Sequence, residues 1–109
     1  MGCDFLKKLE EIIRERIESK PPGSYTYELY SEGPQRIAKK FGEEAVEVVI
    51  SYLRGERKGV LSEGADLIYH FLLLLVSAGL SLDEVCEELE RRHEGSHSEL
   101  LSGECGERE

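Results

Sequence analysis

Apolar residues recur three and four positions apart along most of this chain, with charged residues between them, which is the pattern of amphipathic helices. Proline and glycine interrupt this pattern and set the bounds of each segment. We expect helices over residues 4–19, over 34–53, from a start between 58 and 62 to Gly79, and from Ser81 to about His93, with 24–30 as a short helix or an ordered loop. The periodicity predicts an all-α fold, an antiparallel helical bundle of four to five helices.

Boundary residues support these bounds. Pro34 suits the first turn of a helix because it has no N–H to leave unpaired, and Gly55 closes the same helix. Gly79 is expected just past the end of the third long helix. Ser81 and Glu84 then form a capping box, which opens the last helix.

The third long helix is apolar nearly all round from Ala65 onward, so we expect other helices to enclose it. Its most apolar stretch, residues 67–80, contains His70 and is shorter than the ~20 residues that span a bilayer. Glu63 and Asp66 directly precede that stretch. The pattern predicts a buried helix of a soluble protein, with no membrane partner.

The length of 109 residues is that of one domain. We assign residues 1–93 to an all-α domain and residues 94–109, which are rich in Gly, Ser and Glu, to a flexible acidic tail. A chain this short buries a modest core and gains much from pairing with a second copy. We therefore expect homodimerisation to complete the bundle.

The net charge of −9 argues against nucleic acid as a partner, because phosphate backbones are met by basic surfaces. An acidic protein that acts on phosphates needs a cation as intermediary, although acidity can also serve solubility alone. The three cysteines, Cys3, Cys86 and Cys105, have no metal-binding spacing and are odd in number. They predict reduced thiols of a cytoplasmic protein.

Five acidic residues on two of the expected helices form the most informative pattern, Glu43, Glu44, Glu47, Glu63 and Asp66. Residues three or four apart on a helix point the same way, so Glu44 pairs with Glu47, and Glu63 pairs with Asp66. The segment between the pairs is long enough to end one helix, turn and start an antiparallel neighbour. The two pairs could then face each other across a helix–helix seam.

Carboxylates gathered in this way repel one another, which raises their pKa values unless a cation is present. An all-oxygen site without Cys or His ligands suits a hard ion, Mg²⁺ or Mn²⁺. Glutamates on a solvated helix face are common, and spacing alone leaves that simpler interpretation open. Two features favour a site: both pairs lie in apolar helices, and Lys39 and Lys40 stand one turn before Glu43, where they could meet an anionic ligand.

Three stretches of the chain together resemble one enzyme family. They are Ser24-Tyr25-Thr26, the run KKFGEEAVEV at 39–48 and the run EGADLIYH at 63–70. They resemble phosphoribosyl-ATP pyrophosphohydrolase of the all-α (MazG-like) nucleotide pyrophosphohydrolase superfamily, over a match from about Phe5 to Arg92. The superfamily shares the pattern EExxE…ExxD, and the longer forms found here are more specific to this member.

This resemblance implies hydrolysis of phosphoribosyl-ATP to phosphoribosyl-AMP and pyrophosphate, with Mg²⁺, in the cytoplasm and in histidine biosynthesis, by a homodimer. It implies that Glu44, Glu47, Glu63 and Asp66 hold the metal. Glu43 would orient or deprotonate the attacking water.

The cations that would hold the phosphates are, in order of preference, Lys39 and Lys40, then Arg14, Arg16 and Arg36. For the arginines, a solvated surface charge without substrate contact is the more frequent outcome.

Tyr25 and Thr26 either bind the substrate or form a structural turn. His70 is either a partner of the Asp66 carboxylate or a buried, hydrogen-bonded core residue, and we favour the second role.

Two other functions compete with this one. The first is a house-cleaning pyrophosphatase of the same superfamily, which removes non-canonical or surplus deoxynucleoside triphosphates, or dUTP. The carboxylates do not separate these substrates, because they act on phosphates alone. The Ser24-Tyr25-Thr26 stretch and the Tyr69-His70 pair favour phosphoribosyl-ATP instead. The second is a non-enzymatic interaction module in which the third long helix forms a dimer seam and the acidic residues are only solvated.

Overall fold

The computed structural model describes residues 4–95. Five helices account for most of this part of the chain, which contains no strand: α1 (Asp4–Ser19), α2 (Tyr25–Ser31), α3 (Pro34–Leu53), α4 (Arg57–Ser77) and α5 (Leu82–Gly95). The prediction of an all-α fold is confirmed. Most of the tail predicted at 94–109 lies outside the described residues, while its first two residues belong to α5.

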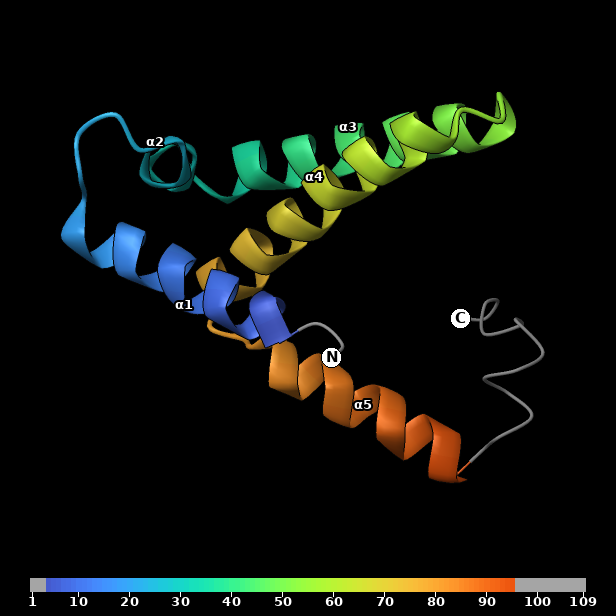
Figure 1. Cartoon of the computed structure of the whole chain (residues 1–109). Coiled ribbons are helices and arrows are strands. Elements are labelled where there is room, and N and C mark those ends of the chain that lie inside the picture. The colour runs from blue at the N-terminus through green and yellow to red at the C-terminus, as the bar shows by residue number, and fades with distance from the viewer. Residues whose placement is uncertain (1–3, 96–109) are drawn as a thin grey trace.

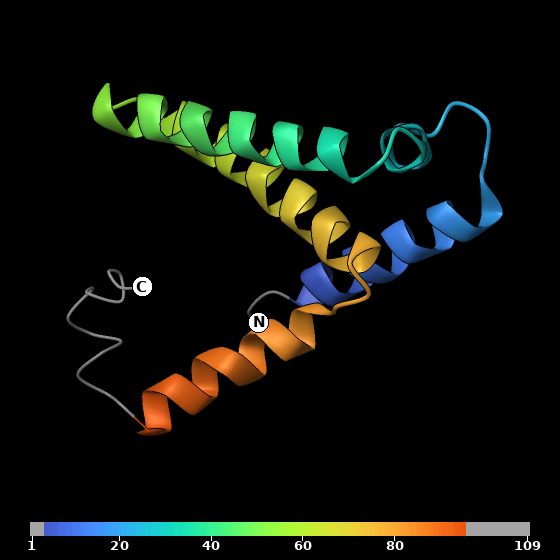
Figure 2. The ribbon, with the colours of Figure 1, turned by 180° about the vertical axis from the view of Figure 1, so that it is seen from behind.

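The helices α3 and α4 form an antiparallel hairpin and lie side by side over most of their length (Figure 1). The first helix, α1, packs across the C-terminal part of α4, and the short α2 contacts α1, α3 and α4. The last helix, α5, extends away from this body (Figure 2). The hairpin is therefore the element that can bring residues of the two predicted carboxylate pairs together.

The hydrophobic core lies where α1, α2 and α3 meet the C-terminal half of α4. Its buried members are Ile13, Leu29, Ile37, Leu72, Leu73 and Leu75. Burying one such side chain contributes roughly 1.5–3 kcal/mol. Because half of these residues come from one segment of α4, that helix anchors the fold at its C-terminal end.

Both helices of the hairpin carry apolar residues that the rest of the described chain leaves exposed. They are Val46, Val49, Ile50 and Leu53 on α3, and Leu61 and Ile68 on α4. The predicted enclosure of α4 therefore holds for Leu72 and Leu73 but not for Ile68, which is 44% exposed.

The end of α4 has the predicted glycine. Gly79 has a positive φ of 76°, a conformation that glycine adopts without steric cost. The Leu80 N–H donates to the Leu75 carbonyl at 2.8 Å, and the Gly79 N–H donates to Val76 at 3.0 Å, which is a Schellman motif.

The predicted capping box at the start of α5 is also present. Ser81 N–H donates to Glu84 Oε1 at 2.8 Å, and Glu84 N–H donates to Ser81 Oγ at 3.3 Å. A second acid supports the same helix end, because Glu10 on α1 is only 5% exposed and its Oε2 accepts the Leu82 N–H at 3.1 Å. The negative charge of Glu10 also suits the positive end of the helix dipole.

By length and composition alone, α4 is apolar enough to cross a membrane. The core helix of a soluble protein meets the same criterion. In this structure α4 contacts α1, α2 and α3 and supplies half of the buried core. These contacts place the C-terminal half of α4 in the core, whereas only 22% of its apolar window is buried.

Candidate active site

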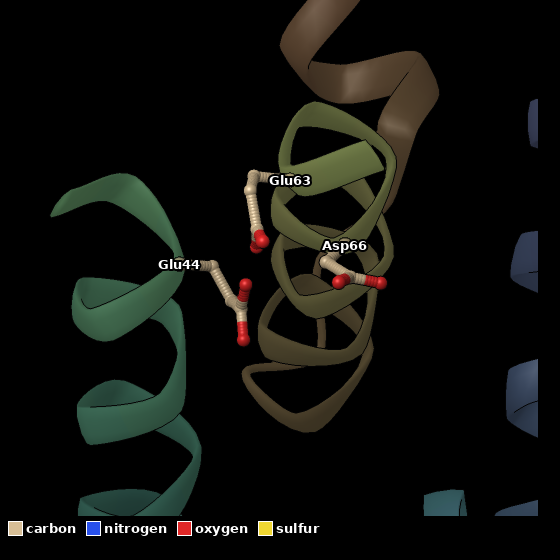
Figure 3. Close-up of side chains that lie close together, drawn as sticks. All are labelled: Glu44, Glu63 and Asp66. Atoms are coloured by element: carbon tan, nitrogen blue, oxygen red, sulfur yellow. The ribbon is translucent and has the colours of Figure 1, made fainter. Parts of the chain in front are cut away.

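Three carboxylates converge at the seam between α3 and α4. Glu44 projects from α3 toward Glu63 and Asp66, which lie one turn apart on α4 (Figure 3). One ligand oxygen of each residue lies within 4.8 Å of the other two. The antiparallel hairpin thus brings one member of the first predicted pair to both members of the second.

The place of Glu44 on α3 follows from the sequence pattern of the seam. Ile37 and Ser51, seven residues before and after it, are the two buried residues of α3. Residues seven apart lie on the same side of a helix, so Glu44 points toward α4 as they do. Close packing at the tip of the hairpin supports this register, because a Cβ on Gly59 would lie 2.6 Å from Ser51 Oγ.

The Oε1 atom of Glu44 is buried, and among residues 4–95 no hydrogen-bond partner reaches it. A buried charged oxygen without a partner is costly, and native proteins seldom keep one without an ion or a function. The exposed Asp66 and the half-buried Glu63 complete an all-oxygen donor set beside it. The three residues fit a hard divalent cation such as Mg²⁺.

The pKa of Glu63 is raised above the ordinary carboxyl value. The largest cause is the closeness of the Glu44 carboxylate, to which only a protonated Glu63 could donate a hydrogen bond; desolvation and the negative charges of Glu44 and Asp66 follow. All of these disfavour the ionised form, as expected for carboxylates that share a site. A bound cation would reverse this effect by attracting all three charges.

Glu47 and Glu43 lie outside this group of three. Both are exposed, and together with Lys39 they line a hollow of about 330 Å³ on the outer face of α3. Lys40 Nζ lies 3.7 Å from Glu43 Oε1. The predicted site residues of α3 are thus divided between the seam, which holds Glu44, and the adjoining outer face.

The three arginine candidates all take part in ion pairs with nearby acids. Arg14 Nη2 lies 3.2 Å from the buried Glu10, and Arg36 Nε lies 3.0 Å from Glu32. Arg16 Nε lies 3.7 Å from the neighbouring Glu15. The side chains of the three arginines are nevertheless 44–48% exposed, so these pairs leave part of each guanidinium open to solvent.

The Ser24-Tyr25-Thr26 stretch lies at the start of α2, and two of its side chains form hydrogen bonds to α4 close to the carboxylates. Ser24 caps α2 by accepting the Tyr27 N–H at 3.1 Å. The Tyr25 hydroxyl lies 2.9 Å from His70 Nε2, and Thr26 Oγ1 is hydrogen-bonded to the Tyr69 hydroxyl. Successive residues of α2 therefore meet successive residues of α4.

His70 and Thr26 are buried, at 5% and 7% exposure, whereas Tyr25 is 48% exposed. His70 Nδ1 also lies 2.7 Å from the backbone carbonyl of Asp66. His70 is thus a buried, hydrogen-bonded residue, and its bond to Asp66 is to the backbone carbonyl and not to the carboxylate.

Two contacts of this region were missed by the sequence reasoning. No contact was predicted between Thr26 and Tyr69, and no role was predicted for Glu10. Glu10 lies four residues after Leu6 and three before Ile13, on the apolar stripe of α1. An acid within an apolar stripe is the signal that could have identified it.

Comparison with known proteins decides the family. A family model described as phosphoribosyl-ATP pyrophosphohydrolase matches residues 6–93. The chain belongs to the phosphoribosyl-ATP pyrophosphohydrolase family. The resemblance in its motifs is confirmed, and so is the prediction that it is a hydrolase.

Relatives of high identity support this assignment. A phosphoribosyl-ATP pyrophosphatase of Pyrobaculum islandicum is 58% identical over 92 residues, which cover 84% of this chain and 98% of the relative. One of Metallosphaera sedula is 53% identical and covers 82% and 96%, respectively. A histidine biosynthesis bifunctional protein of Thermotoga maritima is 47% identical over 81% of this chain and 45% of its own length.

Proposed function

We propose that this chain hydrolyses phosphoribosyl-ATP to phosphoribosyl-AMP and pyrophosphate, with Mg²⁺ as cofactor, as a step of histidine biosynthesis in the cytoplasm. The observation that carries this proposal is the convergence of Glu44, Glu63 and Asp66 within 4.8 Å, beside a buried Glu44 oxygen that has no hydrogen-bond partner in the described part of the chain. Because the chain belongs to a pyrophosphohydrolase family, we interpret these three carboxylates as ligands of a catalytic metal ion.

Glu44, Glu63 and Asp66 would hold the metal. Glu47, one turn after Glu44 and exposed on the outer face of α3, would join them as a further ligand only by turning its side chain toward the seam. When bound, Mg²⁺ would neutralise the polyphosphate and stabilise the charge that develops on pyrophosphate as it leaves. Mn²⁺ has the same preference for oxygen ligands and could replace it.

The residues of the outer face of α3 would carry out the remaining steps. Glu43 would accept a proton from water as that water attacks the α-phosphorus. The bond from the α-phosphorus to the bridging oxygen then breaks, and pyrophosphate leaves with that oxygen. Lys39 and Lys40 would bind phosphate oxygens, and the ion pair with Lys40 would orient the Glu43 side chain.

The substrate-binding residues would include Tyr25, whose half-exposed ring lies beside the cluster, and Thr26, which supports Tyr25 from within through its bond to Tyr69. Arg14 would stay a weaker candidate because Glu10 already neutralises much of its charge. His70 would not contact the substrate itself; it would lie behind Tyr25 and form a hydrogen bond with the Tyr25 hydroxyl.

We further propose that the enzyme is a homodimer whose partner covers the exposed apolar faces of α3 and α4. Val46, Val49 and Leu53 are more than half exposed on α3, and Leu61 is 75% exposed on α4. An apolar surface of this kind on a small protein marks an interface. Val49→Glu should give a monomer in sedimentation equilibrium, whereas an unchanged mass would place the contact elsewhere.

Release of pyrophosphate from phosphoribosyl-ATP, with and without Mg²⁺, tests the activity. The same assay on ATP, deoxynucleoside triphosphates and dUTP compares the alternative substrates. We expect Mg²⁺-dependent turnover with the largest kcat/KM for phosphoribosyl-ATP. A larger kcat/KM for a deoxynucleoside triphosphate would favour the house-cleaning function, and absence of turnover on every nucleotide would favour the interaction module.

A further inference from the structure

The hydrogen bonds of His70 determine which of its ring nitrogens carries the proton. Nδ1 lies 2.7 Å from the Asp66 backbone carbonyl, which can only accept, so Nδ1 is the donor. In the neutral imidazole the other nitrogen, Nε2, is then an acceptor. With His70 neutral, the Tyr25 hydroxyl, 2.9 Å from Nε2, donates its only proton to His70.

This arrangement leaves the Tyr25 oxygen with lone pairs alone. Tyr25 is 48% exposed, so its remaining hydrogen-bonding capacity is available to a ligand. Phosphate oxygens only accept hydrogen bonds, and the Tyr25 oxygen has no further proton to offer them. The group that it can bind is a donor, such as a sugar hydroxyl of the nucleotide.

Several contacts hold the hydroxyl in this position. The Tyr25 ring meets the His70 ring edge to face, with centroids 5.9 Å apart and planes at 84°. Tyr69 packs against both rings and is itself fixed by Thr26. Burial and the nearby charge of Glu44 raise the pKa of Tyr25, which keeps the donated proton on the phenol.

We propose that His70 is a positioning residue that makes the Tyr25 hydroxyl a fixed hydrogen-bond acceptor beside the carboxylate cluster, for a donor group on the sugar of the nucleotide. This inference rests on the proposed function for the identity of the ligand. It does not rest on that function for the state of His70, because the two hydrogen bonds belong to the protein alone.

The state of His70 is read directly from its ring nitrogens. In long-range ¹H–¹⁵N spectra at mildly alkaline pH, we expect a protonated Nδ1 and an unprotonated Nε2, assigned by the loss of these signals in His70→Asn. Tyr25→Phe should shift Nε2 and leave Nδ1 nearly unchanged. A proton on Nε2, or an Nε2 signal unaffected by Tyr25→Phe, would overturn the proposal whether or not the protein hydrolyses any nucleotide.

Kinetics test the consequence for the substrate. Loss of one hydrogen bond should raise the KM of Tyr25→Phe about tenfold with kcat nearly unchanged, since it removes binding rather than chemistry. His70→Asn should match this loss, and the double variant should lose no more. His70→Gln, whose amide oxygen can stand near the position of Nε2, should recover part of the affinity.

Tyr30→Phe is the matched control, because Tyr30 lies on the same helix and is 39% exposed. It should behave as the unmodified protein. His70 would have a purely structural role if the losses of substrate affinity in Tyr25→Phe and His70→Asn add up in the double variant. The same conclusion would follow if the loss in each variant correlates with its melting temperature and not with the absence of the Tyr25 hydroxyl.

Discussion

Replacing Glu44 by glutamine removes one of three converging charges while it keeps the size of the side chain. Because the ligand oxygens of Glu44, Glu63 and Asp66 lie within 4.8 Å of one another, their repulsion must be opposed by the rest of the fold when no cation is bound. The metal-free Glu44→Gln variant should therefore be more stable than the unmodified protein. With Mg²⁺ present, the order should reverse.

The expected gain in stability of the metal-free Glu44→Gln variant can be calculated from the repulsion within one pair of carboxylates. Two unit charges 4.8 Å apart repel by about 1 kcal/mol at the dielectric constant of water and by about 3.5 kcal/mol at an effective value of 20. Asp66 is exposed, so the Glu44–Asp66 repulsion lies toward the lower figure. In a domain of this size, about 1 kcal/mol corresponds to a rise of about 4–8 °C in melting temperature.

Thermal unfolding followed by circular dichroism, with a chelator and then with Mg²⁺, measures both effects. Glu87→Gln is the control, since it makes the same change in net charge at an exposed position of α5. Mg²⁺ should raise the melting temperature of the unmodified protein and of Glu87→Gln, and should have little effect on Glu44→Gln. If Glu44→Gln is no more stable than the control without metal, the carboxylates do not repel as argued.

Three further predictions concern other carboxyl groups. Glu43→Gln should reduce kcat at least a hundredfold with Mg²⁺ affinity kept, and calorimetry that detects lost metal binding would make Glu43 a ligand. Glu10→Ala leaves the Leu82 N–H unpaired, so chemical unfolding should show a loss of about 2 kcal/mol, against less than about 0.5 kcal/mol for Glu11→Ala on the exposed side of α1. Because the pKa of Glu63 is raised, protons compete with Mg²⁺ from a higher pH than at an ordinary carboxylate. The rise in melting temperature caused by Mg²⁺ should thus shrink as the pH falls toward that pKa, and a pH-independent rise would contradict it.

The helix bounds could be predicted where a residue type dictates the backbone. Pro34 and the glycines at 55 and 79 interrupt the helical pattern for steric reasons, and α3 runs over the predicted residues. The start of α4 lacks such a residue. Glu56 is its N-cap and makes no side-chain hydrogen bond to the helix, so the expected start, between 58 and 62, is later than the observed Arg57.

The candidate site was predictable within each helix but not across the seam. Spacing shows that Glu44 and Glu47 lie on similar sides of α3, yet a three-residue step still rotates the side chain by about 60°. Which of the two points at α4 depends on how the hairpin packs, and in the structure it is Glu44 that joins Glu63 and Asp66. No pattern along the chain encodes that choice.

The contacts between α2 and α4 likewise could not be predicted from a pattern along the chain. Tyr25 and His70 are 45 residues apart, and no periodicity links them. Their two sequence motifs could be recognised as features of the family, whereas the bond that joins them comes from the way α2 packs against α1, α3 and α4.

The division of α4 into two halves explains how a small protein tolerates clustered charges. Its C-terminal half supplies Leu72, Leu73 and Leu75 to the core, while Glu63 and Asp66 lie in the half that is more open to solvent. Asp66 and Leu72 are six residues apart, about 9 Å along the helix. The free energy gained at one end can thus hold the other end in a conformation that like charges oppose, and His70 lies between the two. A bound cation would relieve the repulsion among the carboxylates, which is the part of the structure that opposes folding. For this reason metal binding and stability should be coupled in this protein.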